Sequence, residues 1–386
     1  MESWKRKLRM GMVGGGEGAF IGGVHRIAAA LDGQIELVAG AFSRDFENTR
    51  RTAEKLYLDP ARCYRSYDEM ATRESALPAG ERIDFVAIVT PNNLHFPVAK
   101  AFLDAGIHVV CDKPMTFTLE EAEQLAKLVE KTGLVFALTH NYTGNELVRE
   151  ARELFRNGEM GDVRKVLVEY LQDFLAYPHE TEGQKQAVWR VDPKQAGLGG
   201  TLGDCGSHAL NLLEYITGDT VVALCADKST FLPGRTLDED VNVLFRLKGG
   251  GKGVLTVSQI AIGEENALRI RAYGSTGAIV WDQENPNYLS VYKYGEPRQT
   301  YTRASGYLSA PALVVNRVPT GHPEGYLEAF ANIYVGAVDA IRAHADGKPL
   351  PPAEYTFPTV HDGVRGMKFI TKAVESAEKG SVWVEM

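Results

Sequence analysis

The stretch Gly14-Gly15-Gly16-Glu17-Gly18-Ala19-Phe20-Ile21-Gly22 decides the fold of the first part of this chain. It follows the apolar segment Leu8–Val13 and precedes Val24–Leu31, whose apolar residues recur at helical spacing. A glycine-rich turn between a strand and a helix lets backbone N–H groups approach phosphate oxygens at the positive end of the helix. The stretch therefore predicts a dinucleotide-binding turn; a tight strand-to-helix turn without a ligand is the alternative.

The spacing of the glycines predicts which residues of this turn bind the cofactor. Gly14 and Gly16 fit the first two glycines of the dinucleotide fingerprint, whereas the third position by count is Ala19, and the loop then runs on. Phe20 and Ile21, in the loop before the predicted helix, complete this part of the predicted cofactor site.

Short apolar segments alternate with segments of helical spacing up to about residue 140. The predicted buried strands are Leu8–Val13, Glu36–Phe42, Phe85–Val89, His108–Cys111 and Val135–Thr139. The predicted helices are Val24–Leu31, Asn48–Leu56, Leu94–Ala105 and Leu119–Lys131. This alternation predicts an α/β Rossmann domain over residues 1–140, with a doubly wound parallel sheet.

The pattern changes after Asn141 to longer strands joined by turn-rich segments. The predicted strands are Val163–Leu171, Val221–Ser229, Val241–Leu247, Gly253–Ile260, Ala267–Tyr273 and Ala278–Trp281. The predicted helices are Ala209–Ile216, Tyr326–Ala345 and Val360–Lys379. We expect an α+β domain over residues 141–386 with a large, mostly antiparallel open sheet, the last helix (360–379) packing back towards the first domain. Arg303–Pro323 lacks clear periodicity and is predicted to be a long functional loop.

Composition and charge exclude several classes of protein. The 386 residues include 42 Lys and Arg against 50 Asp and Glu, a formal net charge of −8, so no basic field favours nucleic acid or an anionic membrane. The four cysteines lie far apart, and no His or Cys pair has metal-ligand spacing, so we expect reduced thiols and no metal site. With no apolar run long enough for a membrane span or an export signal, we expect a soluble, cytoplasmic protein.

The end of the second predicted strand bears on the choice between NAD and NADP. A carboxylate at this position would hold the ribose hydroxyls and repel a 2′-phosphate, but Ser43 stands there, followed by Arg44. Arg44 can pair with a phosphate or stack on the adenine, which permits NADP; a solvated loop arginine is the alternative.

Two further motifs follow predicted strands of the first domain, at the sheet edge where open α/β sheets place their chemistry. They are Thr90-Pro91-Asn92-Asn93-Leu94-His95 and Asp112-Lys113-Pro114. Pro114 disfavours a helical backbone at Lys113, whose ammonium group can stabilise a developing alkoxide on a substrate. An ordinary loop is the alternative for a Lys-Pro pair after a strand.

A third motif, Gly199-Gly200-Thr201-Leu202-Gly203-Asp204-Cys205-Gly206-Ser207-His208, leads into a predicted helix. Asp204 and His208 are four residues apart and share one helical face. An imidazole can remove a hydroxyl proton near neutral pH while a carboxylate orients it. A helix cap at Asp204 and a buried structural histidine at His208 are the alternatives.

These motifs together resemble the Gfo/Idh/MocA family of nicotinamide-dependent sugar and polyol oxidoreductases. The resemblance rests on the glycine loop with His25, Thr90-Pro91-Asn92 with His95, Asp112-Lys113-Pro114, and Gly199-Gly200 followed by Asp204 and His208. It implies a Rossmann domain, an antiparallel sheet that forms a homodimer or homotetramer, and catalysis by Lys113, Asp204 and His208. It also implies that Thr90, Pro91, Asn92, His95 and Lys113 contact the cofactor.

A narrower resemblance, to levoglucosan dehydrogenase-like members of the family, covers the glycine loop, Thr139–Gly144, Gly183–Gln186 and Gly321–Tyr326. It implies NAD as the preferred cofactor and oxidation of a ring hydroxyl, at C3, of an anhydrosugar. The residues predicted to bind the substrate are Lys113, Asn141, Tyr142, Gln184, Lys185, Trp189, Arg190, Asp204, His208 and His322. An inositol, aldose or glycoside dehydrogenase is the alternative within the family, and a cofactor- or sugar-sensing regulator is the alternative outside catalysis.

Overall fold

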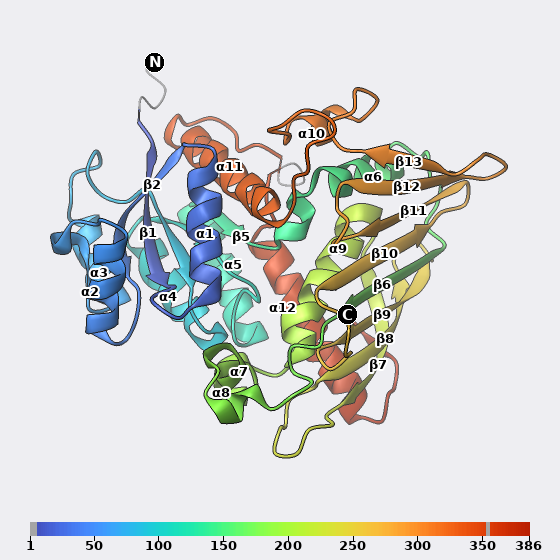
Figure 1. The fold of residues 1–386 in the computed structure, drawn as a ribbon, viewed down its shortest axis with the longest axis horizontal. Helices are drawn as coiled ribbons and strands as arrows, with labels where there is room; N and C mark the ends of the chain where they lie inside the picture. Colours follow the sequence, from blue (N-terminus) through green and yellow to red (C-terminus); the bar gives the residue numbers. More distant parts are fainter. Residues whose placement is uncertain (1–5, 353–355) are drawn as a thin grey trace. The chain divides into compact units, whose positions relative to one another are not determined.

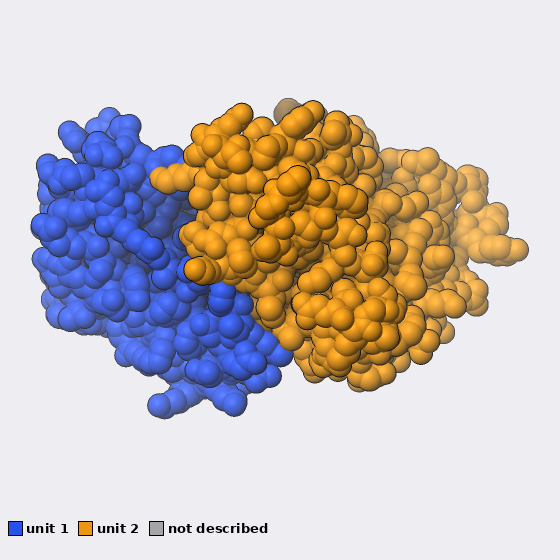
Figure 2. All heavy atoms as spheres, turned by 90° about the horizontal axis from the view of Figure 1, so that it is seen from below, with its two compact units in different colours: residues 1–140, 330–364 blue, residues 141–329, 365–386 orange. Residues whose placement is uncertain are grey.

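The computed structural model describes residues 6–352 and 356–386. The chain divides into two compact units (Figure 2): residues 1–140 with 330–364 form unit 1, and residues 141–329 with 365–386 form unit 2. The predicted second domain, 141–386, included residues 330–364, which the structure groups with unit 1.

The physical reason for this correction lies in helix α11 (Tyr326–Ala345). Tyr334 of this helix hydrogen-bonds His25 at 2.7 Å, and Phe330 packs edge-on against the same imidazole. Further on, the Pro358 carbonyl accepts a hydrogen bond from the backbone N–H of Leu138. The sequence predicted α11 as a helix, but its periodicity does not say which sheet the helix covers.

The core of unit 1 is a parallel sheet in the order β2-β1-β3-β4-β5 (Figure 1). Its strands are β1 (Leu8–Gly14), β2 (Ile35–Ala41), β3 (Phe85–Val89), β4 (His108–Cys111) and β5 (Phe136–Leu138). Its helices are α1 (Phe20–Leu31), α2 (Phe46–Lys55), α3 (Tyr67–Ser75), α4 (His95–Asp104) and α5 (Leu119–Thr132), together with α11. The strand order reverses between β1 and β3, which places Gly14 beside Val89 at the carboxyl ends of both strands. The predicted Rossmann fold is confirmed; α3 was not predicted.

Unit 2 contains a nine-stranded sheet in the order β13-β12-β11-β10-β6-β9-β8-β7-β14. Its strands are β6 (Lys165–Leu171), β7 (Val221–Ser229), β8 (Asp240–Leu247), β9 (Lys252–Ser258), β10 (Ala267–Tyr273), β11 (Gly277–Asp282), β12 (Tyr288–Lys293), β13 (Gln299–Thr302) and β14 (Val384–Glu385). Neighbouring strands are antiparallel except β6 and β9, so the predicted mostly antiparallel sheet is confirmed. β8 alternates strictly between buried and more exposed residues, which means that one face is covered and the other is open.

Helices α6 (Glu146–Arg156), α9 (Ser207–Thr217) and α12 (Val360–Glu378) are the longer helices beside this sheet (Figure 1). Helix α6 was not predicted, because Arg149, Glu150 and Glu153 are buried in it and hide its apolar periodicity. The short helices α7 (Lys185–Arg190) and α8 (Pro193–Ala196), and strands β12 to β14, were also not predicted. The predicted last helix is divided: residues 360–364 belong to unit 1 and the rest to unit 2.

The segment predicted as a long loop, Arg303–Pro323, is organised around its first residue. The buried Arg303 guanidinium donates to Asn316 and Glu324, and helix α10 (Ala310–Leu313) lies within the segment. In the described parts of the chain, no helix is long and apolar enough to cross a membrane. The four cysteines are free thiols.

Candidate functional site

The glycine loop after β1 is shaped by close backbone approaches. Gly14 and Gly15 have φ angles of 85° and 72°, which favour glycine, and a Cβ on Gly14 would lie 2.6 Å from the Val89 carbonyl oxygen. A Cβ on Gly22 would lie 2.4 Å from the Gly15 Cα. Gly22 therefore performs the helix-packing task of the third fingerprint glycine, which counting assigned to Ala19.

Gly16, predicted to contact the cofactor, also packs against the next loop of the domain. Its N–H donates to the Phe42 carbonyl at 3.1 Å, and a Cβ there would lie 2.4 Å from the Asn48 side-chain oxygen. The structure thus places Gly16 at the junction with the β2–α2 loop, as a packing glycine.

The start of α1 fits a dinucleotide phosphate. Helix α1 begins at Phe20 and Ile21, and its N-cap residue, Ala19, offers no side-chain acceptor for the first-turn amides. Such amides carry partial positive charge and bind anions. Together with the glycine cradle, this donor set is compatible with a pyrophosphate.

The β2–α2 loop holds the two residues predicted to choose between NAD and NADP. The Ser43 hydroxyl accepts a hydrogen bond from the Asp45 N–H at 3.2 Å, and Asp45 in turn caps α2. Arg44 is exposed on the same loop.

The loop after β3 contains one hydroxyl with an unmet hydrogen-bonding need. Thr90 Oγ1 is buried and has no hydrogen-bond partner among the described residues, so it is available to a ligand at the end of β3. Pro91 precedes a short helical turn, Asn92–Leu94, in which Asn92 is buried.

His95 is a structural link between two loops. Its ring nitrogens lie 2.7 Å from the Pro114 carbonyl oxygen and 2.9 Å from that of Thr90, and the residue is 1% exposed. Both nitrogens face backbone carbonyl oxygens, so His95 joins the Thr90 loop to the Lys113 loop; the cofactor contact predicted for it stays a prediction.

Lys113 follows β4 and is held by Asp112. The Asp112 carboxylate accepts from the Lys113 N–H at 2.8 Å and from the Thr139 hydroxyl at 2.9 Å, and the Lys113–Pro114 peptide bond is cis. His140, at the end of the neighbouring strand, is buried; burial and then the Lys113 charge lower its pKa to about 3. The sequence analysis did not assign His140 a role.

In unit 2, Asp204 and His208 lie on one continuous helical run. Residues Leu202–Gly206 form a π-helix, closed by the Ser207 N–H donating to the Leu202 carbonyl, and α9 continues from it. Such π-turns widen a helix and are frequent at functional sites. The buried Asp238, a residue that sequence reasoning missed, accepts from the backbone N–H groups of Gly200 and Leu202 at 2.8 and 2.7 Å and fixes the entry to this run.

The Asp204 carboxylate is bound by side chains from two other elements. Its Oδ2 accepts from Arg190 Nε of α7 and from Gln259 Nε2 after β9, each at 3.1 Å. The Arg190 guanidinium also donates to Gln186 at 2.6 Å and lies 4.5 Å from the Trp189 ring centroid. Arg190 and Trp189 were predicted substrate residues, whereas Gln259 was not predicted.

His208 packs among aromatic rings. Its ring centroid lies 4.8 Å from that of Tyr142 and 6.1 Å from that of Tyr170. The two tyrosine hydroxyls are 2.7 Å apart, and Tyr170 donates to Asn266 at 2.7 Å. Burial raises the pKa of Tyr142 to about 12, so its phenol is neutral. Tyr142, predicted to bind substrate, is 4% exposed and contacts the general-base candidate directly.

Two amide groups close in sequence to Tyr142 and His208 have unmet hydrogen-bonding capacity. Asn141 Nδ2, next to Tyr142 in the chain, and Asn211 Oδ1, one turn beyond His208 on α9, are buried without a partner among the described residues. One is a donor and the other an acceptor, which suits hydroxyl groups.

The remaining predicted substrate residues lie elsewhere in unit 2. Gln184 caps α7 by accepting from the Ala187 N–H at 2.7 Å, and Lys185 is exposed in the first turn of that helix. His322 is exposed, and its ring lies 3.2 Å from the Pro319 carbonyl oxygen of its own loop. The structure thus groups Tyr142, Trp189 and Arg190 with the Asp204–His208 run, and gives Gln184 a capping role.

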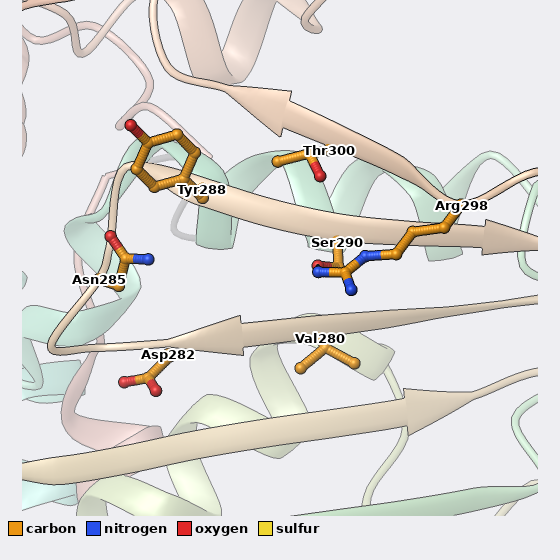
Figure 3. Close-up of a pocket in the computed structure, with 7 residues that line it drawn as sticks. All are labelled: Val280, Asp282, Asn285, Tyr288, Ser290, Arg298 and Thr300. Atoms are coloured by element: carbon orange, nitrogen blue, oxygen red, sulfur yellow. The ribbon is translucent and has the colours of Figure 1, made fainter.

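A cavity of about 290 Å³ lies on the open face of the sheet (Figure 3). It is lined by Val280, Asp282, Asn285, Tyr288, Ser290, Arg298 and Thr300. None of the predicted site residues lines it.

Comparisons with known proteins match both units. A family model described as an oxidoreductase family with an NAD-binding Rossmann fold matches residues 8–140, and a model of the GFO/IDH/MocA C-terminal domain matches residues 148–280. The uncharacterised oxidoreductase YfiI of Bacillus subtilis (strain 168) is 35% identical over 386 residues, which cover 98% of this chain and 97% of that protein. Levoglucosan dehydrogenase of Pseudarthrobacter phenanthrenivorans is 26% identical to this chain. The match covers 99% of this chain and 98% of that protein.

A solved structure, an inositol dehydrogenase homologue from Azotobacter vinelandii in complex with NAD+, superposes with a TM-score of 0.93. It is 37% identical, and the match covers 99% of this chain and 98% of that one. A further structure of the same description contains NADH and myo-inositol.

Proposed function

This chain belongs to the GFO/IDH/MocA family of NAD(P)-dependent oxidoreductases and carries an NAD-binding Rossmann domain, and from that premise we propose that it oxidises a secondary ring hydroxyl of a neutral cyclic sugar, anhydrosugar or polyol to a ketone. Bound NAD supplies the hydride acceptor. The alcohol carbon gives up a hydride, and its oxygen gives up a proton.

The pairing of Arg190 with Asp204 carries this proposal. The two side chains are about equally shielded, with exposed fractions of 23% and 21%, and join at 3.1 Å on the run that leads to His208. Because the Arg190 charge is balanced by Asp204, this part of unit 2 favours a neutral ligand over a sugar acid or phosphate. The donor at Asn141 and the acceptor at Asn211 suit a ligand rich in hydroxyl groups.

Each predicted catalytic residue has a role in this reaction. His208 accepts the hydroxyl proton, Lys113 stabilises the negative charge that develops on the oxygen, and Asp204 orients the participating groups. Tyr142 holds the His208 ring through its edge-on contact at 4.8 Å.

The substrate we favour is an anhydrosugar of the levoglucosan type, oxidised at C3, since levoglucosan dehydrogenase matches nearly the whole chain. The second candidate is an inositol, supported by the higher identity of 37% to the inositol dehydrogenase homologue. Both are uncharged rings that carry secondary hydroxyls.

The test is NAD reduction, followed by absorbance, against levoglucosan, myo-inositol, common aldoses and simple glycosides. We expect turnover on at least one cyclic polyol and a loss of at least ~10²-fold in Lys113→Ala and His208→Ala. Tight NAD binding with no turnover on any of these, in either direction, would support a cofactor-sensing regulator instead.

We also propose that two or four copies associate through the open face of the nine-stranded sheet. Leu244, on the outward side of β8, is 50% exposed, and burial of apolar side chains that stand open on a sheet face favours association. Light scattering at micromolar concentration should give a dimer or tetramer; a monomer would contradict this proposal.

A further inference from the structure

Gln259 lies directly after β9 at a point where its backbone is fixed on both sides. Its N–H donates to the Glu239 carbonyl at 3.0 Å, and its carbonyl accepts from the Leu175 N–H at 2.8 Å. The residue is 2% exposed. A buried amide side chain attached to a backbone that is fixed in this way has little freedom to move.

The side chain of Gln259 has a different partner for each of its polar atoms. Its Oε1 lies 3.1 Å from the Thr201 hydroxyl, and its Nε2 lies 3.1 Å from Asp204 Oδ2 and 3.0 Å from Gln172 Oε1. The two N–H groups therefore have two acceptors. The reversed amide would set an oxygen against a carboxylate, so Asp204 itself decides the orientation.

The contact with Gln172 extends this arrangement to the rings around His208. Gln172 Nε2 donates to Asn266 at 2.7 Å, and Asn266 accepts from the Tyr170 hydroxyl. A continuous set of hydrogen bonds thus joins Asp204 to the Tyr142–Tyr170 pair. Gln259 is the link between the carboxylate and the aromatic surroundings of the histidine.

On this geometry, and resting on the proposed function, we infer that Gln259 is a positioning residue that holds the Asp204 carboxylate in its catalytic orientation. It acts through Asp204. Through its hydrogen bond to Gln172 it also fixes the position of that carboxylate relative to the tyrosines that contact His208. Arg190 supplies the charge-balancing bond to the same oxygen, and Gln259 supplies the neutral one. Hydrogen bonds to a charged group contribute more than those between neutral groups, so losing this one has a measurable effect.

A double-mutant cycle tests this inference on the fastest substrate of the panel at saturating NAD. We expect Gln259→Leu to lower kcat by roughly tenfold, with less than a twofold change in KM, as for one bond to a charged group. In a chain that already carries Asp204→Asn, the same replacement should have little further effect, because both act through one group. Independent, multiplying losses would overturn the inference.

Two further variants distinguish a specific effect on Asp204 from a general loss of folding. Gln259→Glu keeps the shape of the side chain but replaces the donor by an acceptor, and should lose at least as much kcat as Gln259→Leu. Gln195→Leu is the matched control, since Gln195 Nε2 also donates to an aspartate, Asp192, at 2.9 Å in α8. Control turnover should stay within twofold of wild type; equal losses in the control and in Gln259→Leu would overturn the inference.

A spectroscopic measurement separates this inference from the proposed function. In chain labelled with ¹³C at the aspartate carboxyl groups, the Asp204 signal is assigned by its absence in Asp204→Asn and titrated in wild type and in Gln259→Leu. The ionisable groups around it include Arg190 of α7 and the phenols of Tyr142 and Tyr170, with Cys205 next to it and His208 four residues on in the chain.

We expect the titration midpoint of Asp204 to move to higher pH in Gln259→Leu, because a donor to the charged form is lost. Identical titrations would overturn the inference whatever the enzyme oxidises. Wild-type turnover in Asp204→Asn would instead overturn the proposed catalytic role of Asp204. The titration would then still show whether Gln259 donates a hydrogen bond to the Asp204 carboxylate.

Discussion

Gly22 lies so close to Gly15 that the first turn of α1 and the glycine loop have no room for a side chain between them. A Cβ on Gly22 would lie 2.4 Å from the Gly15 Cα and 2.8 Å from its carbonyl oxygen, and both contacts are backbone. The next residue, Gly23, differs: a Cβ there would meet only the end of the Arg26 side chain, at 4.0 Å. Of these two adjacent glycines in α1, Gly22 thus has no room for a side chain, whereas Gly23 has room for one.

This contrast predicts opposite effects of alanine. Gly22→Ala should destabilise the protein by about 1–3 kcal/mol, the usual cost of overpacking, and should weaken NAD binding because the loop is displaced. Gly23→Ala should be neutral or stabilise by up to about 1 kcal/mol, since alanine favours a helix interior over glycine. Urea unfolding and fluorescence titration with NADH measure both effects. Equal behaviour of the two variants would contradict the assignment of Gly22 as the packing glycine.

His108 makes the stability of unit 1 depend on pH. Its Nδ1 accepts from the Val135 N–H at 2.9 Å, so the ring is neutral, and burial together with His344 lowers its pKa to about 4. Between pH 6.5 and 4 the unfolded chain binds a proton that the folded chain does not, so stability falls as the pH falls through this window. At pH 4 the loss from His108 should reach about 3 kcal/mol.

His108→Asn tests this directly, because the Asn oxygen can accept the same N–H without titrating. We expect its free energy of unfolding, from urea titrations at pH 7, 5.5 and 4.5, to fall less steeply than that of the wild type. His361→Asn, at an exposed position, is the control and should follow the wild-type slope. Parallel slopes for His108→Asn and wild type would refute the assignment.

The β2–α2 loop should decide between NAD and NADP. Ser43 stands where a carboxylate would repel a 2′-phosphate, and Arg44 is exposed beside it. Ser43→Asp should lower kcat/KM with NADP by roughly five- to thirtyfold, while NAD stays within about twofold, since one charge pair in a partly solvated site is worth roughly 1–2 kcal/mol.

Arg44→Ala should lower kcat/KM with NADP alone. Arg50→Ala removes an exposed arginine of α2 that pairs with Glu47, and serves as the control for a general loss of positive charge. If Arg44→Ala affects both cofactors equally, Arg44 stacks on the adenine rather than pairing with a phosphate.

The parts of this fold that could be predicted are those with strong local patterns. The strands of unit 1 are continuous apolar runs, and their alternation with helices leaves only a parallel, doubly wound sheet. Helix α6 was missed because its buried face carries Arg149, Glu150 and Glu153. The Ser309 N–H, from a distant segment, donates to Glu150, and Arg156 of the same helix pairs with Glu153. The return of α11 to unit 1 depends on tertiary contacts such as His25–Tyr334, which no local pattern encodes.

The candidate site divides in the same way. Asp204 and His208 could be found because a turn rich in glycine leads into a helix that carries both. Gln259 and Gln172 could not, since an isolated glutamine in a strand pattern has no chemical signature, and only the pairing of β6 with β9 brings them together. Gln184, predicted to bind substrate, caps α7 in the structure, a role that its position beside a sequence motif did not indicate.

Arg235 should control the segment that carries α7, and so the affinity for substrate. Its guanidinium makes five hydrogen bonds: two to Glu180, one to Glu239, and one each to the carbonyls of Leu175 and Tyr177. These bonds hold the chain that leads to α7 and hence to Arg190. Arg235→Lys keeps the charge but has three donors in place of a planar fork, so we expect KM to rise by about three- to tenfold while kcat changes less.

Arg235→Met should be more severe, because it removes the cation that pairs with Glu239, a carboxylate that is only 1% exposed. We expect the free energy of unfolding to fall by about 3–5 kcal/mol. Arg271→Lys, in a surface pair with Glu169, should change stability by less than about 1 kcal/mol and leave KM unaltered. Steady-state kinetics and urea unfolding distinguish the two sites. An unchanged KM in Arg235→Lys would mean that the segment before α7 is held in place without this arginine, and that the position of Arg190 is set by Asp204, Gln186 and Trp189 alone.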